Sequence, residues 1–314
     1  MVDLPSMAAM MPETLHLHPE LRVDAGRLLA QIGTKSTDDT RNWLARLKVT
    51  QISGRHQNKT IQWEDPVSIE LSAQQTDQNI TIENLRCDSS FMKITGSGDA
   101  NHVEVDGTCN LNILMQNVSQ FVETDHAVAG QMRFDGRWNR VADDQSTIAA
   151  NATVTDFILQ SPGLLPWREK QLTASLTGQG MATLQQLQQV NQLEFSLISQ
   201  NDRLTVGLIE PTTLTQTKPV PLRVNLTGNL NSWAARTSPF MNLGSWRPNG
   251  RVTAAGQVSV ASNQCRIIQS TIVAEDFTAS NGDVVFQDAH LQACLLYTSP
   301  SPRDLSTSRM PSSA

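Results

Sequence analysis

Apolar and polar residues alternate over most of this chain, and this pattern constrains its fold more than any other feature. The alternation is clear in the following segments: VSIELSA (67–73), LTASLTG (172–178), LEFSL (193–197), LRVNLTG (222–228) and RVTAAGQVSV (251–260). Successive side chains of a β-strand point to opposite faces, so each segment is expected to form a strand with one apolar and one polar face. The chain is therefore predicted to be an all-β protein.

The alternating segments are separated by short pieces rich in turn-forming residues, such as TDQN, GSGDAN, SQND and ASNG. Strands joined in this way favour an antiparallel meander with one face in water. Short helices are predicted over 111–122 and 230–240, whereas 25–46 fits either a helix or strands. The same alternation also fits an ordinary two-sheet β-sandwich, and this alternative stays open at the level of the sequence.

The chain contains an internal repeat. The segment NLNILMQNVSQF (110–121) matches NLNSWAARTSPF (229–240), and GQMRFDG (130–136) matches GRVTAAG (250–256). The offsets are 119 and 120 residues, and Trp63 matches Trp167 at an offset of 104. Matches in the same order predict tandem units that stack on one another.

The repeat defines the expected domain organisation: an incomplete N-terminal segment (1–45), a first β unit (46–166) and a second β unit (167–293). The remaining segment, 294–314, begins CLLYTSPSPRD and resembles the translation of a DNA adapter used in sequencing. It is therefore expected to be an artefactual, disordered tail that replaces the true C-terminus.

Composition excludes several function classes. The formal net charge of −6 and the lack of basic clusters argue against a nucleic-acid surface. No apolar run is long enough to span a membrane, and the first residues do not resemble a signal peptide. Cys87, Cys109 and Cys265 have no metal-binding spacing and are predicted to be free side chains in strands, with a Cys87–Cys109 disulfide as the less favoured alternative.

Motifs for catalysis or for a cofactor are lacking as well. The chain has no P-loop, GxSxG or HExxH motif, and its glycine-rich pieces are not followed by a helix as a dinucleotide site requires. His16 and His18 lack further ligands at metal-binding spacing, so they are interpreted as an exposed polar pair. The sequence thus predicts no enzyme activity, no cofactor and no metal site.

The pieces IQWEDPVSIELSAQQTDQNITIENLRCDSSFMKITGSGD, DGTCNLNILMQNVSQFV and GRVTAAGQVSV resemble the AsmA-like proteins, a broad group that includes TamB-like translocation and assembly proteins. The likeness covers roughly residues 45–293. It implies a curved, groove-like sheet of tandem repeats, polar outside and apolar within. It also implies a periplasmic or cell-envelope location, membrane anchoring through a segment missing from this sequence, and outer-membrane assembly proteins as partners.

The function that the resemblance implies is non-enzymatic: shielding or conducting phospholipid acyl chains between membranes, or scaffolding outer-membrane assembly. The expected groove-lining residues are Ile69, Leu71, Leu172, Leu176, Leu193, Phe195, Val224 and Leu226. The alternative is an adhesive or structural surface module built as a β-sandwich. A β-helical carbohydrate-active enzyme is a third class, but the acids and aromatics of this sequence do not cluster as such an active site requires.

Overall fold

The computed structural model describes residues 2–3 and 21–296, with short gaps at 38, 57–58, 77–78, 121–123, 143, 183–186, 214–218, 262–263 and 283. His16 and His18 lie outside the described residues, as do residues 297–314 of the segment that resembles an adapter. Residues 294–296 of that segment form the end of a strand, so the predicted disordered tail is wrong for these three residues. The first half contains β1 (Val2–Asp3), β2 (Leu21–Ser36), β3 (Arg41–His56), β4 (Lys59–Trp63), β5 (Val67–Gln75), β6 (Ile80–Asp88), β7 (Met92–Asp99), β8 (His102–Asn110), α2 (Leu111–Val118), β9 (Ala127–Arg140) and β10 (Gln145–Gln160). The second half contains β11 (Trp167–Ala182), β12 (Leu187–Ser199), β13 (Asp202–Leu208), β14 (Thr212–Thr213), β15 (Val220–Asn229), α3 (Leu230–Thr237), β16 (Arg247–Ala261), β17 (Gln264–Asn281) and β18 (Val284–Leu296).

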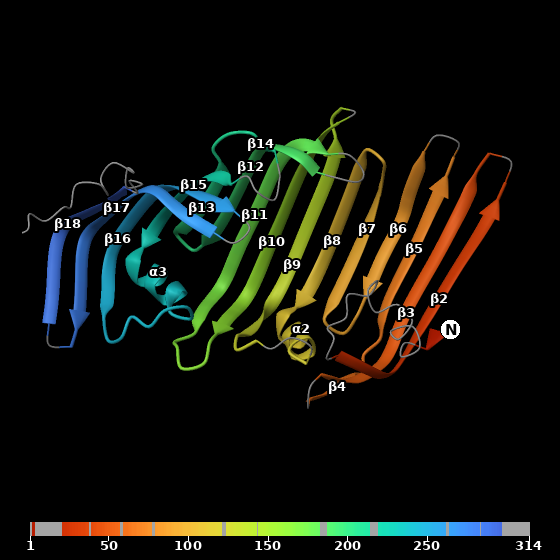
Figure 1. Cartoon of the computed structure of the whole chain (residues 1–314), viewed down its shortest axis with the longest axis horizontal. Helices are drawn as coiled ribbons and strands as arrows, with labels where there is room; N and C mark the ends of the chain where they lie inside the picture. The colour runs from red at the N-terminus through yellow and green to blue at the C-terminus, as the bar shows by residue number, and fades with distance from the viewer. Residues whose placement is uncertain are drawn as a thin grey trace, which may run out of the picture.

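All the strands belong to one antiparallel sheet (Figure 1). Each long strand pairs with the next one along the chain, from β2 to β18, while the short β1, β4 and β14 pair at its margins. The predicted fold class, an antiparallel meander with two short crossover helices, is confirmed. The two-sheet sandwich is wrong for the described residues, because the strands that contact one another are neighbours within this single sheet.

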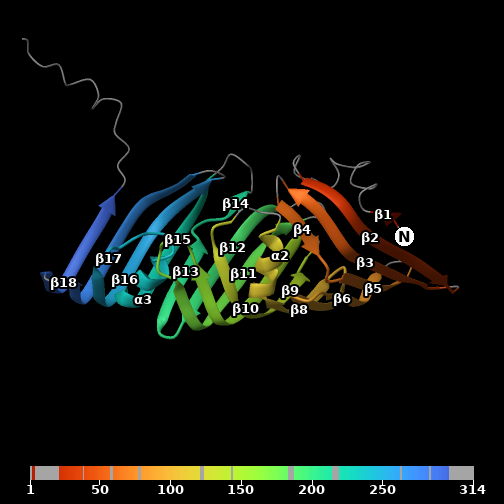
Figure 2. The ribbon, with the colours of Figure 1, turned by 90° about the horizontal axis from the view of Figure 1, so that it is seen from below.

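The sheet is curved into an open trough (Figure 2). β2 and β18 lie at its two ends, and α2 lies inside the curve, against β8 and β9. The curvature follows from the right-handed twist that every strand carries, which accumulates over a long sheet. As a result one face of the sheet is concave and the other is convex.

The same backbone irregularity recurs at three places in the sheet. In the hairpin β9–β10, Asp156 has a left-handed backbone (φ 51°) opposite Gly130 (φ 140°), and the register shifts there. In the hairpin β16–β17, Asp276 (φ 50°) and Gly250 (φ 128°) form the same bulge 120 residues further on. The conserved position of the bulge within each hairpin supports a true structural repeat.

The close approach of the two strands explains the glycines at these bulges. A Cβ atom on Gly130 would lie 3.0 Å from the Thr155 carbonyl oxygen, and one on Gly250 would lie 2.7 Å from the Glu275 carbonyl oxygen. Both glycines also have a positive φ that other residues adopt only with strain. A bulge of this type adds local twist and thereby bends the strand pair.

A third copy of the bulge lies in the region 25–46, which the sequence left undecided. β2 and β3 form a hairpin in which Gln51 has a left-handed backbone (φ 54°) and the register shifts on both sides of Ala25. This region is therefore strand, not helix.

Candidate functional site

An apolar row runs across the whole sheet on one face. Each member of this row pairs directly with the next on the neighbouring strand. The row consists of Ile32, Ala45, Leu71, Leu85, Gly96, Val105, Gly136, Ala150, Leu176, Phe195, Val206, Val224, Gly256, Ser270 and Leu295. At about 4.8 Å per strand, it extends roughly 70 Å.

A second row beside it is apolar from end to end. It consists of Ala30, Leu47, Ile69, Cys87, Ile94, Gly107, Phe134, Ala152, Ala174, Leu197, Leu204, Leu226, Ala254, Ile272 and Ala293. We call the face that carries these two rows the apolar face. The residues between them point to the other side and are mostly polar, as the pair Arg46–Glu70 illustrates.

All eight residues expected to line a groove lie on this apolar face. Four of them belong to the first row and two to the second, while Leu193 and Leu172 lie in flanking rows. Seven of the eight are half-buried, whereas Leu172 is buried (8% exposed). The register therefore brings together residues that are up to 157 positions apart in the sequence.

Glycine and alanine occupy many positions of the apolar face and leave room for larger neighbours. The ring of Phe134 occupies the space above Gly107, where a Cβ atom would lie 2.3 Å from its Cζ atom. Large side chains on a small-residue floor cover the backbone of the neighbouring strand. The result is a smooth apolar surface rather than a closed pocket.

The described residues place no second layer on the middle of this face. The element contacts are those between neighbouring strands, together with those of α2 to β8 and β9 and those of α3 to β11, β15 and β16. Several large apolar side chains of the face remain well exposed, including Ile32 (77%), Ile148 (45%) and Leu295 (60%). Exposed apolar surface on this scale is typical of a binding surface.

The helices cover one margin of the apolar face. Asn110 caps α2 by accepting a hydrogen bond from the Ile113 backbone N–H (3.1 Å), and Gln62 N–H donates to Gln120 Oε1 just after the helix (2.8 Å). Near this junction Cys109 (3% exposed) and Phe91 (8% exposed) are buried, and burial raises the pKa of the Cys109 thiol. Cys87, Cys109 and Cys265 are all free, so the predicted absence of a disulfide among them is confirmed.

α3 is attached to the sheet by a buried ionic cluster. Arg236 Nε lies 2.7 Å from Glu169 Oε1, and Arg236 Nη1 lies 2.7 Å from Asp202 Oδ2. The Trp233 ring lies 4.6 Å below the guanidinium group. Asp202 occupies the space beside Gly228, a residue of the apolar face, which places α3 on that face.

Further hydrogen bonds satisfy the two carboxylates of this cluster. Glu169 accepts from Ser199 Oγ (2.6 Å) and Trp167 Nε1 (3.0 Å), and Asp202 accepts from the Asn229 N–H (2.7 Å). All three charged side chains are at most 8% exposed. Buried charges are tolerated when they are paired and hydrogen-bonded in this way, so the cluster has a structural role.

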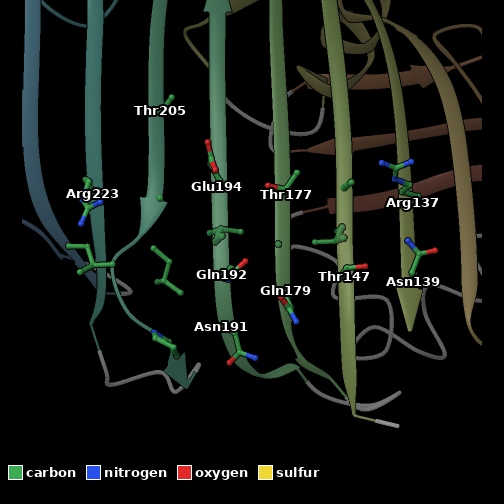
Figure 3. A pocket seen from close by; sticks show the side chains of 18 of the residues that line it. Arg137, Asn139, Thr147, Thr177, Gln179, Asn191, Gln192, Glu194, Thr205 and Arg223 are labelled. Atoms are coloured by element: carbon green, nitrogen blue, oxygen red, sulfur yellow. The ribbon is translucent and has the colours of Figure 1, made fainter. Parts of the chain in front are cut away.

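The opposite face of the sheet carries a polar hollow of about 1010 Å³ between β8 and β15 (Figure 3). Side chains of neighbouring strands line it side by side: Arg137, Asn139, Thr147, Thr177, Gln179, Asn191, Gln192, Glu194, Thr205 and Arg223. At its edge a hydrogen bond with Asn139, and secondarily the charge of Glu104, raises the pKa of His102. This lining is polar and of mixed charge, and sequence reasoning did not identify it.

Neither face presents a recognisable catalytic or metal centre in the described part of the chain. A search of the described residues finds no group of three His, Cys, Asp or Glu side chains that could hold a metal ion. The same part of the chain contains no helix with the length and hydropathy needed to cross a bilayer. The apolar face is therefore the strongest candidate for a functional surface.

Comparison of the chain with protein-family models, with curated proteins and with solved structures finds no match. The assignment of function consequently depends on the geometry described above and on the chemistry of the two faces.

Proposed function

We propose that this chain is a non-enzymatic lipid-shielding protein whose apolar face holds phospholipid acyl chains along the trough. The supporting observation is the pair of apolar rows that continues from β2 to β18 beneath no second layer of described residues. Each methylene group that leaves water on such a surface contributes about 0.8 kcal/mol. A partly covered acyl chain would thus be held, while its charged head group stays in solvent.

The uniformity of the rows favours movement of the lipid along the trough. A bound chain meets similar apolar side chains at each successive strand, so no single position holds it much more strongly than the next. The row length of roughly 70 Å exceeds the roughly 30 Å hydrocarbon core of a bilayer. We therefore propose an aqueous space between two membranes, such as the periplasm, as the place of action.

A matched pair of charge substitutions tests this proposal. Val224 lies in the first apolar row, and its neighbour Asn225 points to the polar face. Val224→Glu places a carboxylate among the acyl chains, whereas Asn225→Glu adds the same charge on the polar side. Native mass spectrometry after incubation with phospholipid vesicles should show lipid bound to the parent and to Asn225→Glu, and at least about tenfold less on Val224→Glu.

Equal lipid capture by the two variants would overturn the proposal, as would a parent chain that binds no phospholipid. Circular dichroism and urea unfolding of both variants separate a loss of binding from a loss of folding. Transfer of a fluorescent phospholipid between vesicles then distinguishes conduction from simple shielding. An adhesive surface module, the other function class considered for this sequence, predicts no lipid in any of these experiments.

A further inference from the structure

The contacts of α3 with β11 and with the end of the first unit define a template for how one unit receives the next. α3 and the residues after it reach back to three sites. Arg236 binds Glu169 of β11, Ser238 Oγ donates to the Leu165 carbonyl oxygen (2.9 Å), and the Phe240 ring lies 6.5 Å from the His126 ring. The contacts to Leu165 and His126 join α3 and the residues after it to the end of the first unit, and the contact to Glu169 joins α3 to the strand that follows that end.

The strand β18 is the counterpart of β11. Phe157 on β10 pairs with Glu169 on β11, and Phe277 on β17 pairs with Asp288 on β18 at the same distance beyond the bulge. The apolar residues Leu172 and Ala174 of β11 correspond to Leu291 and Ala293 of β18. Asp288 thus occupies the place of Glu169, whereas Val284, which corresponds to Leu165, lies within β18 and pairs with Asn281.

The third site of the template is also repeated. His126 bonds to Ser161 through Nδ1 and Oγ (2.7 Å), and 120 residues further on Trp246 lies beside Ser245, which bonds to Asn281. Trp246 is therefore the counterpart of His126 as a ring against which an incoming aromatic side chain can pack.

These counterpart sites are uncovered in the described part of the chain. β18 pairs with β17 only, and the one described partner of the Asp288 carboxylate is the His290 N–H (2.9 Å). Trp246 is 44% exposed, and Val284, Val285 and Phe286 are 57%, 66% and 50% exposed. Exposed edge strands of this length and hydrophobicity are normally paired or covered.

We infer that the outer edge of β18, together with Asp288, Val284 and Trp246, is the acceptor surface for another β unit built like residues 178–261. The partner supplies an antiparallel strand for β18 and a short helix with an arginine for Asp288. It also supplies an aromatic ring for Trp246. Such docking extends the apolar face by one more unit without changing its character.

An extended chain tests this inference, in which residues 1–296 are followed directly by a second copy of residues 178–261. Hydrogen exchange of the β18 amides should slow by at least about tenfold, and Trp246 fluorescence should shift to the blue. The matched control omits residue 178 from the copy, because a shift by one residue moves every side chain to the other face. No slowing in the extended chain, or equal slowing in the control, would overturn the inference.

A substitution at Asp288 provides an independent measurement. Asp288→Ala should leave the unfolding midpoint of residues 1–296 nearly unchanged but should speed exchange of the β18 amides severalfold in the extended chain. Asp288→Ala should no longer speed amide exchange when the residue of the copy that corresponds to Arg236 is already alanine, because the two charges act as a pair. Amide exchange in β9 to β11 should be the same in all these variants, which checks that each of them is folded. The inference is contradicted if Asp288→Ala still speeds exchange of the β18 amides after the arginine has been removed.

Discussion

The junctions under α2 and α3 occupy equivalent places in two units, yet they are stabilised by opposite chemistry. Under α2 the neighbouring strands present Met92 and Cys109, a thioether and a buried thiol. Under α3 the corresponding positions hold Asp202 and Gly228, and Arg236 takes the place of Asn117. The two junctions thus share a backbone arrangement, but the side chains packed between helix and sheet are apolar under α2 and ionic under α3.

The glycine in the second junction is the physical counterpart of the aspartate. A Cβ atom on Gly228 would lie 2.0 Å from Asp202 Oδ1, so a carboxylate fits there only because the facing residue lacks a side chain. In the first junction the Cys109 side chain fills that space itself. A carboxylate at position 202 and a side chain at position 228 therefore cannot be present together. To convert one junction into the other, both residues of the facing pair must be substituted at once.

The largest expected effect comes from removing the arginine. Arg236→Ala leaves Glu169 and Asp202 buried without their cation, which should lower the free energy of unfolding by about 3–5 kcal/mol. Asn117→Ala, the equivalent change in α2, should cost less than about 1 kcal/mol. Urea unfolding of both variants measures the difference.

A combined variant sharpens this result. Arg236→Met with Glu169→Gln and Asp202→Asn removes all three charges, and it should recover most of the loss because no unpaired ion remains. If Arg236→Ala alone proved as mild as Asn117→Ala, the buried ionic cluster would not be what secures α3.

The next largest effect tests whether Asp202 and a side chain at position 228 exclude each other. Gly228→Ala should cost about 2–3 kcal/mol, from the clash with Asp202 and from a φ of +145°. Cys109→Ala, at the equivalent position, only removes a sulfur atom and should cost about 1 kcal/mol. Gly33→Ala is the matched control, because an added Cβ there meets no atom within 4 Å; thermal unfolding of all three should rank them in this order.

The backbone, by contrast, should respond equally in both units. Gly130→Ala and Gly250→Ala disturb the same bulge, with close carbonyl oxygens and positive φ values in each case. Each should lower the free energy of unfolding by about 1–3 kcal/mol, and the two losses should agree within about 0.5 kcal/mol. A clear inequality in urea unfolding would show that the bulges are not equivalent.

Much of the fold follows from the alternation alone, because an antiparallel strand with one buried face leaves a period-two pattern. The crossover helices were also predictable from their matched sequences, although α2 and α3 end earlier than expected, at Val118 and Thr237. The hairpin β2–β3 was left undecided between helix and strands. Its consecutive apolar residues Leu28, Leu29 and Ala30 obscure the alternation, and the repeat there is preserved in backbone geometry more than in sequence.

The candidate site was predictable only within each strand. Alternation tells that Leu193 and Phe195 share a face, but it does not tell whether Ile69 lies on that same face, because this depends on register and on the bulges between them. The ionic cluster had no sequence signal. Glu169, Asp202 and Arg236 are far apart in the chain, and Glu169 in WREKQ reads as an ordinary solvated acid.

A smaller effect is expected at the helix caps, which the two units share. Asn110 accepts from the Ile113 N–H and Asn229 accepts from the Asn231 N–H (2.8 Å), so alanine at either position should cost about 1 kcal/mol. Asn→Asp at the same positions keeps the acceptor and should cost less. Unequal losses at the two caps would point to the ionic cluster compensating at α3.

The smallest expected effect is a pH dependence confined to the first unit. The Asn101 and His102 backbone N–H groups donate to Asp99 at the β7–β8 turn (2.7 and 2.9 Å), and these bonds lower the pKa of its carboxyl group. A carboxyl whose pKa is lower when folded stabilises the fold above its unfolded pKa of about 4 and loses that contribution as the pH falls through the folded value. Exchange of the Asn101 and His102 amides should therefore speed up selectively as the pH falls below about 4 and through the lowered folded-state pKa of Asp99. In Asp99→Asn, which keeps an acceptor oxygen but does not titrate, the same amides should show no such change beyond the intrinsic pH dependence of exchange.

The turn between β13 and β15 lacks this carboxylate within the described residues, so its amides should behave like those of the variant. An acid-induced loosening of both turns together would mean that the two units respond to pH as one body, and the contrast between them would then be confined to the helix junctions.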